Sequence, residues 1–111
     1  MANDKRLAML EKMTAAGEAD SFTWYALALE YRSHDRVDDA LATFKTLRGR
    51  DSDYVPMYLI CGTMLAEAQR DNEGREWLES GLVKASEKGE THALSELQDA
   101  LNAIAPPQSL P

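Results

Sequence analysis

One pattern of apolar and small residues occurs twice in the chain, and the second copy follows the first at a single fixed offset. The members of each copy are spaced as on the faces of two successive helices. The offset, about 34 positions, is typical of proteins built from repeated helix hairpins. We therefore predict an all-α fold, an antiparallel helical-repeat stack of the superhelical kind. The first copy is Trp24, Leu27, Ala28, Tyr31, Ala40, Phe44 and Leu47, and the second is Tyr58, Cys61, Gly62, Leu65, Gly74, Leu78 and Gly81.

Helical periodicity extends over nearly the whole chain, and no segment alternates with the period of two that a strand requires. We expect Asp20 or Ser21 to cap the second helix. We expect Asp35 to accept a hydrogen bond from the backbone N–H of Asp38 at the start of the third helix. Pro56 is expected in a first turn, where its missing N–H has no effect. The predicted helices span about 3–15, 21–33, 37–50, 55–68, 72–86 and 90–104.

The chain is short enough to form one domain, which we place at residues 1–105. Within it, the two full repeats are expected at about 21–54 and 55–88, with the helices at 3–15 and 90–104 flanking them. Residues 106–111 contain three prolines and are expected to be a disordered tail.

The composition narrows the classes of partner. The net charge is −7, and residues 53–111 carry ten acidic but only four basic side chains. An acidic surface disfavours nucleic acid and anionic membranes, and it favours a partner with a basic end. One cysteine cannot form an internal disulfide, and no secretory signal or apolar run of about 20 residues is visible, so we expect a cytoplasmic protein.

The repeated residues resemble the tetratricopeptide repeat family, in which two-helix repeats present a concave inner surface to peptides. The resemblance implies that Ala28 and Gly62 lie where the two helices of a repeat come closest. The first helix resembles the second helix of a repeat, because Leu10 and Met13 lie one repeat period before Phe44 and Leu47. The chain departs from the family pattern at Ser52 and Ser86, where proline is usual, at Asp35 and Gln69, where a turn glycine is common, and at Leu47, where alanine is usual. The segment Lys88-Gly89-Glu90-Thr91-His92-Ala93-Leu94 resembles the closing segment of small bacterial members.

The second helix has more apolar residues than one buried stripe requires. Its residues Phe22, Tyr25, Ala26 and Leu29 lie opposite the repeated set, and Pro56, Leu59, Ile60 and Thr63 do so in the fourth helix. In the last helix the same register, with two residues inserted, places His92, Ser95, Glu96 and Asp99 on this side. The predicted partner-binding residues are Phe22, Tyr25, Leu29, Leu59, Ile60, Thr63, His92 and Glu96.

These residues favour a non-catalytic adaptor or scaffold that binds a protein or peptide segment in a concave, largely apolar groove. Two alternatives remain: self-association of a monomer into a homodimer through the same face, and ordinary packing of that face within the chain. The family's clamp for a terminal carboxylate is absent, because Tyr25, Leu29 and Ile60 stand where its basic and amide residues would be.

No residue set predicts catalysis, a cofactor or a metal. Cys61 lies on the predicted core face, away from any cation in sequence. His34 and Asp38 are four residues apart but lie on either side of a turn, so their side chains should diverge. His92 and Glu96 are interpreted as a surface pair, and the role of Trp77 stays open between packing and a second contact surface.

Overall fold

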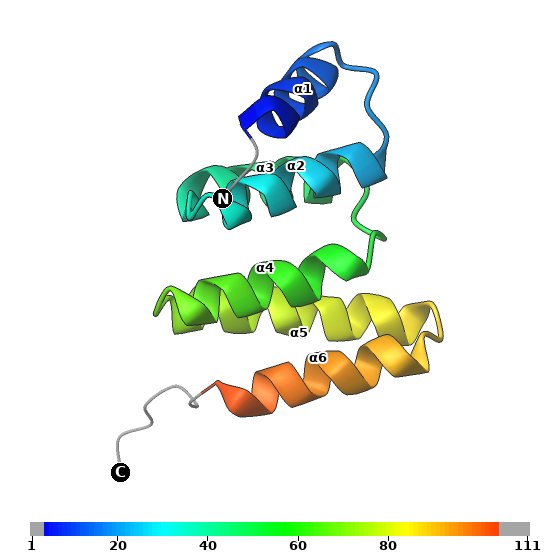
Figure 1. Cartoon of the computed structure of the whole chain (residues 1–111). Helices are drawn as coiled ribbons and strands as arrows, with labels where there is room; N and C mark the ends of the chain where they lie inside the picture. Colours follow the sequence, from blue (N-terminus) through cyan, green and yellow to red (C-terminus); the bar gives the residue numbers. More distant parts are fainter. Residues whose placement is uncertain (1–3, 105–111) are drawn as a thin grey trace. The chain divides into compact units, whose positions relative to one another are not determined.

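A computed structural model of the chain describes residues 4–104 (Figure 1). This part of the chain contains six helices and no strand, which confirms the all-α prediction. Each described helix end lies within one residue of its predicted position, whereas the tail predicted at 106–111 lies outside the described residues. The helices are α1 (Asp4–Ala15), α2 (Ser21–Ser33), α3 (Val37–Arg50), α4 (Pro56–Glu67), α5 (Asp71–Glu87) and α6 (Thr91–Ala103).

The chain divides into two compact units between Tyr54 and Val55, which is the predicted boundary between the two repeats. In the first unit α1 packs against α2, and α2 packs against α3. In the second unit α4 packs against α5, and α6 packs against both. That residues 1–105 form one domain stays a prediction. Within residues 4–104, no helix is long and apolar enough to cross a membrane.

The core of the first unit contains the repeated residues of α2 and α3. Ala28, Ala40, Phe44 and Leu47 are fully buried, as predicted. Ala26, predicted to face outward, is also buried, because Leu7 and Leu10 of α1 cover it. Trp24 and Tyr31 are only partly buried against this same α1 cluster.

The buried face of α1 differs from the predicted one at Met13. Its buried stripe runs through Leu7, Leu10 and Thr14, and this rotates Met13 out into solvent. The buried Thr14 hydroxyl donates to the Leu10 carbonyl, so it needs no partner from another helix. The prediction that Met13 is equivalent to the buried Leu47 is therefore wrong.

Polar contacts also connect α1 to α2. The Tyr31 hydroxyl donates to Glu11 at 2.6 Å, and Arg6 Nε lies 2.9 Å from Glu30 Oε1. Burial and then the hydrogen bond to Glu11 raise the pKa of Tyr31 to about 12. Each contact joins the two helices near their surface, where such pairs add little stability compared with the apolar cluster below.

Glycines let the helices of the second unit approach closely. A Cβ atom at Gly62 would lie 2.6 Å from Leu78, and one at Gly74 would lie 2.8 Å from the Gly62 carbonyl oxygen. A Cβ at Gly81 would lie 2.6 Å from the Cβ of Tyr58, which is fully buried. The small residues of the repeat therefore stand at the closest contacts of α4 with α5, as the family resemblance implied.

The turns inside the hairpins share one backbone geometry. Asp35 and Gln69, which occupy the same position in the two repeats, have φ values of 57° and 66°, and Gly89 has a φ of 68°. The residue after each of them donates its N–H to a carbonyl five residues earlier, which is the Schellman arrangement that ends a helix. These hydrogen bonds are Arg36 to Tyr31, Arg70 to Leu65 and Glu90 to Ala85.

Asp35 consequently ends α2 and is not the N-cap of α3. The N-cap of α3 is Arg36, which makes no side-chain capping bond. The expected bond from the Asp38 N–H to Asp35 stays a prediction. The other predicted end residues are confirmed: Asp20 accepts from the Thr23 N–H at 2.8 Å, and Pro56 begins α4.

We expect Gln69→Gly to raise the free energy of unfolding by about 1 kcal/mol, because the left-handed conformation is unfavourable for a residue with a Cβ. Asp35→Gly should raise it less, since aspartate tolerates this conformation better than glutamine. The measurement is urea unfolding followed by circular dichroism. As a control, Glu67→Gly places glycine in the last right-handed residue of α4 and should lower stability. Equal effects at positions 67 and 69 would contradict the explanation.

Candidate functional site

The amino-terminal half of α2 and the connection after α3 present an aromatic surface, which we define as Phe22, Tyr25 and Tyr54. Phe22 is 65% exposed, although it is a large apolar residue in a helix. Tyr25 lies one turn later and is half-buried, with its ring centroid 5.3 Å from that of Tyr54 and 6.5 Å from that of Phe44. Phe44 thus supports Tyr25 from the core. The aromatic surface is a rigid apolar area beside solvent.

Carboxylates border the aromatic surface. Ser21 donates to Asp51 at 2.6 Å, and Asp20 accepts from both the hydroxyl and the N–H of Thr23. The bond from the Thr23 hydroxyl, followed by that from its N–H, lowers the pKa of Asp20, so this group is ionised at neutral pH. Burial, then the charges of Asp20 and Asp51, raises the pKa of Tyr54, so its ring stays neutral. An apolar patch with negative charge at its edge results.

The pKa of Tyr25 is also raised, first by burial and then by Tyr54, while Arg32 opposes the shift. Leu29, one turn further along α2, is partly buried. The three candidates predicted on this helix are therefore accessible to different degrees, and none is sealed in the core.

The second unit carries its candidates on two helices. Leu59, Ile60 and Thr63 of α4 are partly exposed. The Thr63 hydroxyl donates to the carbonyls of Leu59 and Ile60, at 2.9 Å and 3.1 Å, so it already has partners within its own helix. This part of α4 is predominantly aliphatic.

His92 and Glu96 are the candidates on α6. Their side chains are 91% and 50% exposed, and His92 Nε2 lies 3.2 Å from Glu96 Oε1. The interpretation as a surface pair agrees with this geometry.

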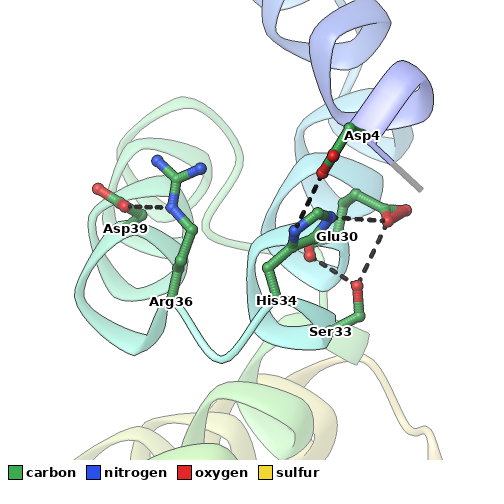
Figure 2. Close-up of polar contacts among 6 residues, drawn as sticks. All are labelled: Asp4, Glu30, Ser33, His34, Arg36 and Asp39. Carbon is green, nitrogen blue, oxygen red and sulfur yellow. Dashed lines mark hydrogen bonds and ion pairs between the residues drawn. The ribbon is translucent and has the colours of Figure 1, made fainter. Parts of the chain in front are cut away.

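His34 and Asp39, on either side of the turn between α2 and α3, have separate partners. Figure 2 shows that His34 lies beside Asp4 of α1 and Glu30 of α2, with Nδ1 3.7 Å from Asp4 and Nε2 3.7 Å from Glu30. Asp39 instead accepts from Arg36 Nε at 2.8 Å (Figure 2). Among the described residues, no group of three or more His, Cys, Asp or Glu side chains is arranged to hold a metal ion.

Two residues whose roles depended on burial are in the core. Cys61 is fully buried, as predicted. Trp77 is also buried, with its ring centroid 5.9 Å from that of Tyr58. Trp77 therefore packs inside the second unit and is not a second contact surface.

Sequence reasoning missed Tyr54, which lies in the connection between α3 and α4 and belongs to no helical stripe. It also missed a repeated ion pair. Arg36 bonds Asp39, and at the same position of the second repeat Arg70 Nε bonds Glu73 at 2.7 Å. A comparison of charged residues one repeat period apart in the sequence would have found this ion pair.

The repeated hairpins, the matching turns and the small residues at the close contacts define a helical-repeat protein. No family model matches the chain, and no curated protein does. Similarity is found among solved structures. A crystal structure of a tetratricopeptide repeat domain protein from Salinibacter ruber is 40% identical, covers 75% of this chain and 93% of that chain, and has a TM-score of 0.68. A solution structure of such a domain protein from the same organism is also 40% identical, covers 75% of this chain and 84% of that chain, and has a TM-score of 0.69.

A third similar structure is the solution structure of a protein from Bordetella parapertussis, with 30% identity, coverage of 86% of this chain and 84% of that chain, and a TM-score of 0.72. The chain belongs to the tetratricopeptide repeat family. Its fold is accordingly a protein-interaction repeat fold.

Proposed function

We propose that the chain is a non-catalytic adaptor that binds a peptide or a segment of another protein. The aromatic surface of α2 is one contact region, with Leu29 beside it. Leu59, Ile60 and Thr63 of α4, with His92 and Glu96 of α6, form a contact region in the second unit. The cytoplasmic location expected from the sequence is part of this proposal.

The exposure of Phe22 is the observation that carries the proposal. Packing within the unit does not require a large apolar side chain at position 22, yet Phe22 is 65% exposed and lies beside the half-buried Tyr25. Large aromatic side chains are frequent among the residues that contribute most to protein interfaces. Removal of such a residue typically costs about 2 kcal/mol of binding free energy, or roughly thirtyfold in affinity.

The chemistry of the ligand follows from the groups around these regions. Asp20 and Asp51 border the aromatic surface, and Glu96 is exposed on α6. We therefore expect a ligand with an apolar anchor and at least one basic side chain. Attraction between exposed charges would mainly speed association and would weaken with salt.

Co-purification from the native cell tests the proposal. Tagged wild type is compared with Phe22→Glu and with the matched control Ala42→Glu, which adds the same charge at an exposed position of α3. We expect one or more proteins to be recovered with wild type and Ala42→Glu but lost from Phe22→Glu, while all three keep the same helical circular dichroism. The same proteins recovered with all three chains would contradict a role of Phe22 in binding.

Light scattering distinguishes the homo-oligomeric alternative. If the apolar faces bind a second copy, wild type should have a dimer mass, and the Tyr25→Glu, Ile60→Glu double variant should be a monomer with its helical signal intact. A wild type that is already monomeric at the concentrations used for co-purification favours a foreign ligand.

A further inference from the structure

Four large apolar side chains are substantially exposed in the described part of the chain: Met9, Met13, Phe22 and Val83. Phe22 belongs to the surface proposed above. The remaining three lie on two other helices, on α1 beside exposed lysines and on α5 beside exposed glutamates. Their surroundings therefore point to an interaction that does not use the aromatic surface.

The α1 surface consists of Lys5, Met9, Lys12 and Met13. Met9 is 57% exposed and Met13 is 45% exposed, and they are four residues apart on one helix face. Lys5 lies one turn before Met9, and Lys12 lies three residues after it, so both exposed lysines flank the methionines. Methionine is flexible and adapts its shape to a partner surface. The α1 surface is apolar at its centre and basic around it.

The α5 surface consists of Glu76, Glu79, Val83 and Glu87. Val83 is 55% exposed, with Glu79 one turn before it and Glu87 one turn after it. Glu76 lies two turns before Val83, and all three glutamates are exposed. Lys84 lies 3.8 Å from Glu87 and offsets part of its charge. The α5 surface is apolar at its centre and acidic around it.

We propose that the α1 surface of one copy of this chain binds the α5 surface of a second copy. The two surfaces are complementary in both respects, because methionines would contact Val83 while lysines lie opposite glutamates. The contact joins two different surfaces, so a pair of copies still presents one surface of each kind, and further copies can add head to tail.

The expected association is weak and depends on salt. Each surface is only about two helical turns long, which is well below the size of a stable protein interface, so a Kd on the order of 100 μM is expected. Exposed charges are screened over about 10 Å at 0.1 M salt. An increase in NaCl from roughly 50 to 500 mM should therefore weaken association about tenfold.

Sedimentation equilibrium of the whole chain, at increasing concentration up to about 1 mM in low salt, tests the proposal. Wild type should increase in mass with concentration. Lys12→Glu should weaken association several-fold, whereas the matched control Lys45→Glu, which makes the same charge reversal at an exposed position of α3, should not. A wild type that stays a monomer throughout, or equal effects of Lys12→Glu and Lys45→Glu, would overturn the proposal.

Two charge-reversed chains provide a sharper test. The first carries Lys5→Glu and Lys12→Glu, and the second carries Glu76→Lys and Glu79→Lys. In the first chain both the α1 and the α5 surface are acidic, and in the second both are basic, so each chain alone should be a monomer. In an equal mixture an acidic surface of one chain can meet a basic surface of the other, so the mixture should associate. If the mixture stays monomeric while wild type associates, the contact between α1 and α5 is wrong. Loss of co-purified proteins in Phe22→Glu would be unaffected by this result, so the two proposals can fail separately.

Discussion

Phe44→Ala is expected to lower the free energy of unfolding by about 3–5 kcal/mol, the range for deleting a buried aromatic ring. Phe44 is fully buried in the first unit, and the ring of Tyr25 rests against it. The substitution leaves a cavity and removes an aromatic contact. Because small proteins are stable by only about 5–15 kcal/mol, this single change would remove a large part of the total. Urea unfolding followed by circular dichroism measures it.

Phe22→Ala is the matched control for Phe44→Ala. It removes the same side chain from an exposed position of the same unit, so stability should change by no more than about 0.5 kcal/mol. Phe44→Ala should also loosen the aromatic surface by removing the support under Tyr25. Similar losses of stability in the two variants would show that the assignment of core and surface in this unit is wrong.

Gly74→Ala is expected to lower the free energy of unfolding by about 1–3 kcal/mol, although alanine is the better helix former. The added Cβ would lie 2.8 Å from the carbonyl oxygen of Gly62 and 3.3 Å from the backbone nitrogen of Ala66. Backbone atoms inside a helix cannot move aside as a side chain can. The two helices must therefore separate, which weakens packing along the contact between α4 and α5.

Gly49→Ala provides the comparison within a helix. A Cβ at Gly49 in α3 meets no atom within 4 Å, so only the helix preference remains and stability should rise by about 0.5–1 kcal/mol. Denaturant unfolding of both variants should therefore give shifts of opposite sign. A stabilising effect of Gly74→Ala would contradict the close approach of α4 and α5.

The helices and their pairing could be predicted because their causes are local or repeated. Apolar spacing predicts each helix, and the small residue Gly62 marks where α4 meets α5. The position of α1 could not be predicted in the same way. Its burial depends on which of several apolar residues fits against Ala26 and Leu27, and the answer excluded Met13.

The candidate surfaces could be predicted only in part. The opposite face of α2 was predicted to be exposed, and this is confirmed for Phe22 but wrong for Ala26. The helix packs against two neighbours, α1 and α3, and α1 covers Ala26. Helical periodicity could not predict the position of Tyr54, because this residue lies in the irregular connection after α3. The course of the backbone in that connection brings its ring next to that of Tyr25. The acidic border at Asp51 depends on the same connection.

Every helix in each unit packs against the helix that follows it in that unit. Short sequence separation between contacting segments is associated with fast folding, because little loop entropy is lost before contacts form. During synthesis, α2 and α3 can pair as soon as both have left the ribosome, without waiting for a distant segment. A nascent chain of this kind exposes its apolar faces only briefly, which limits the time available for misassembly.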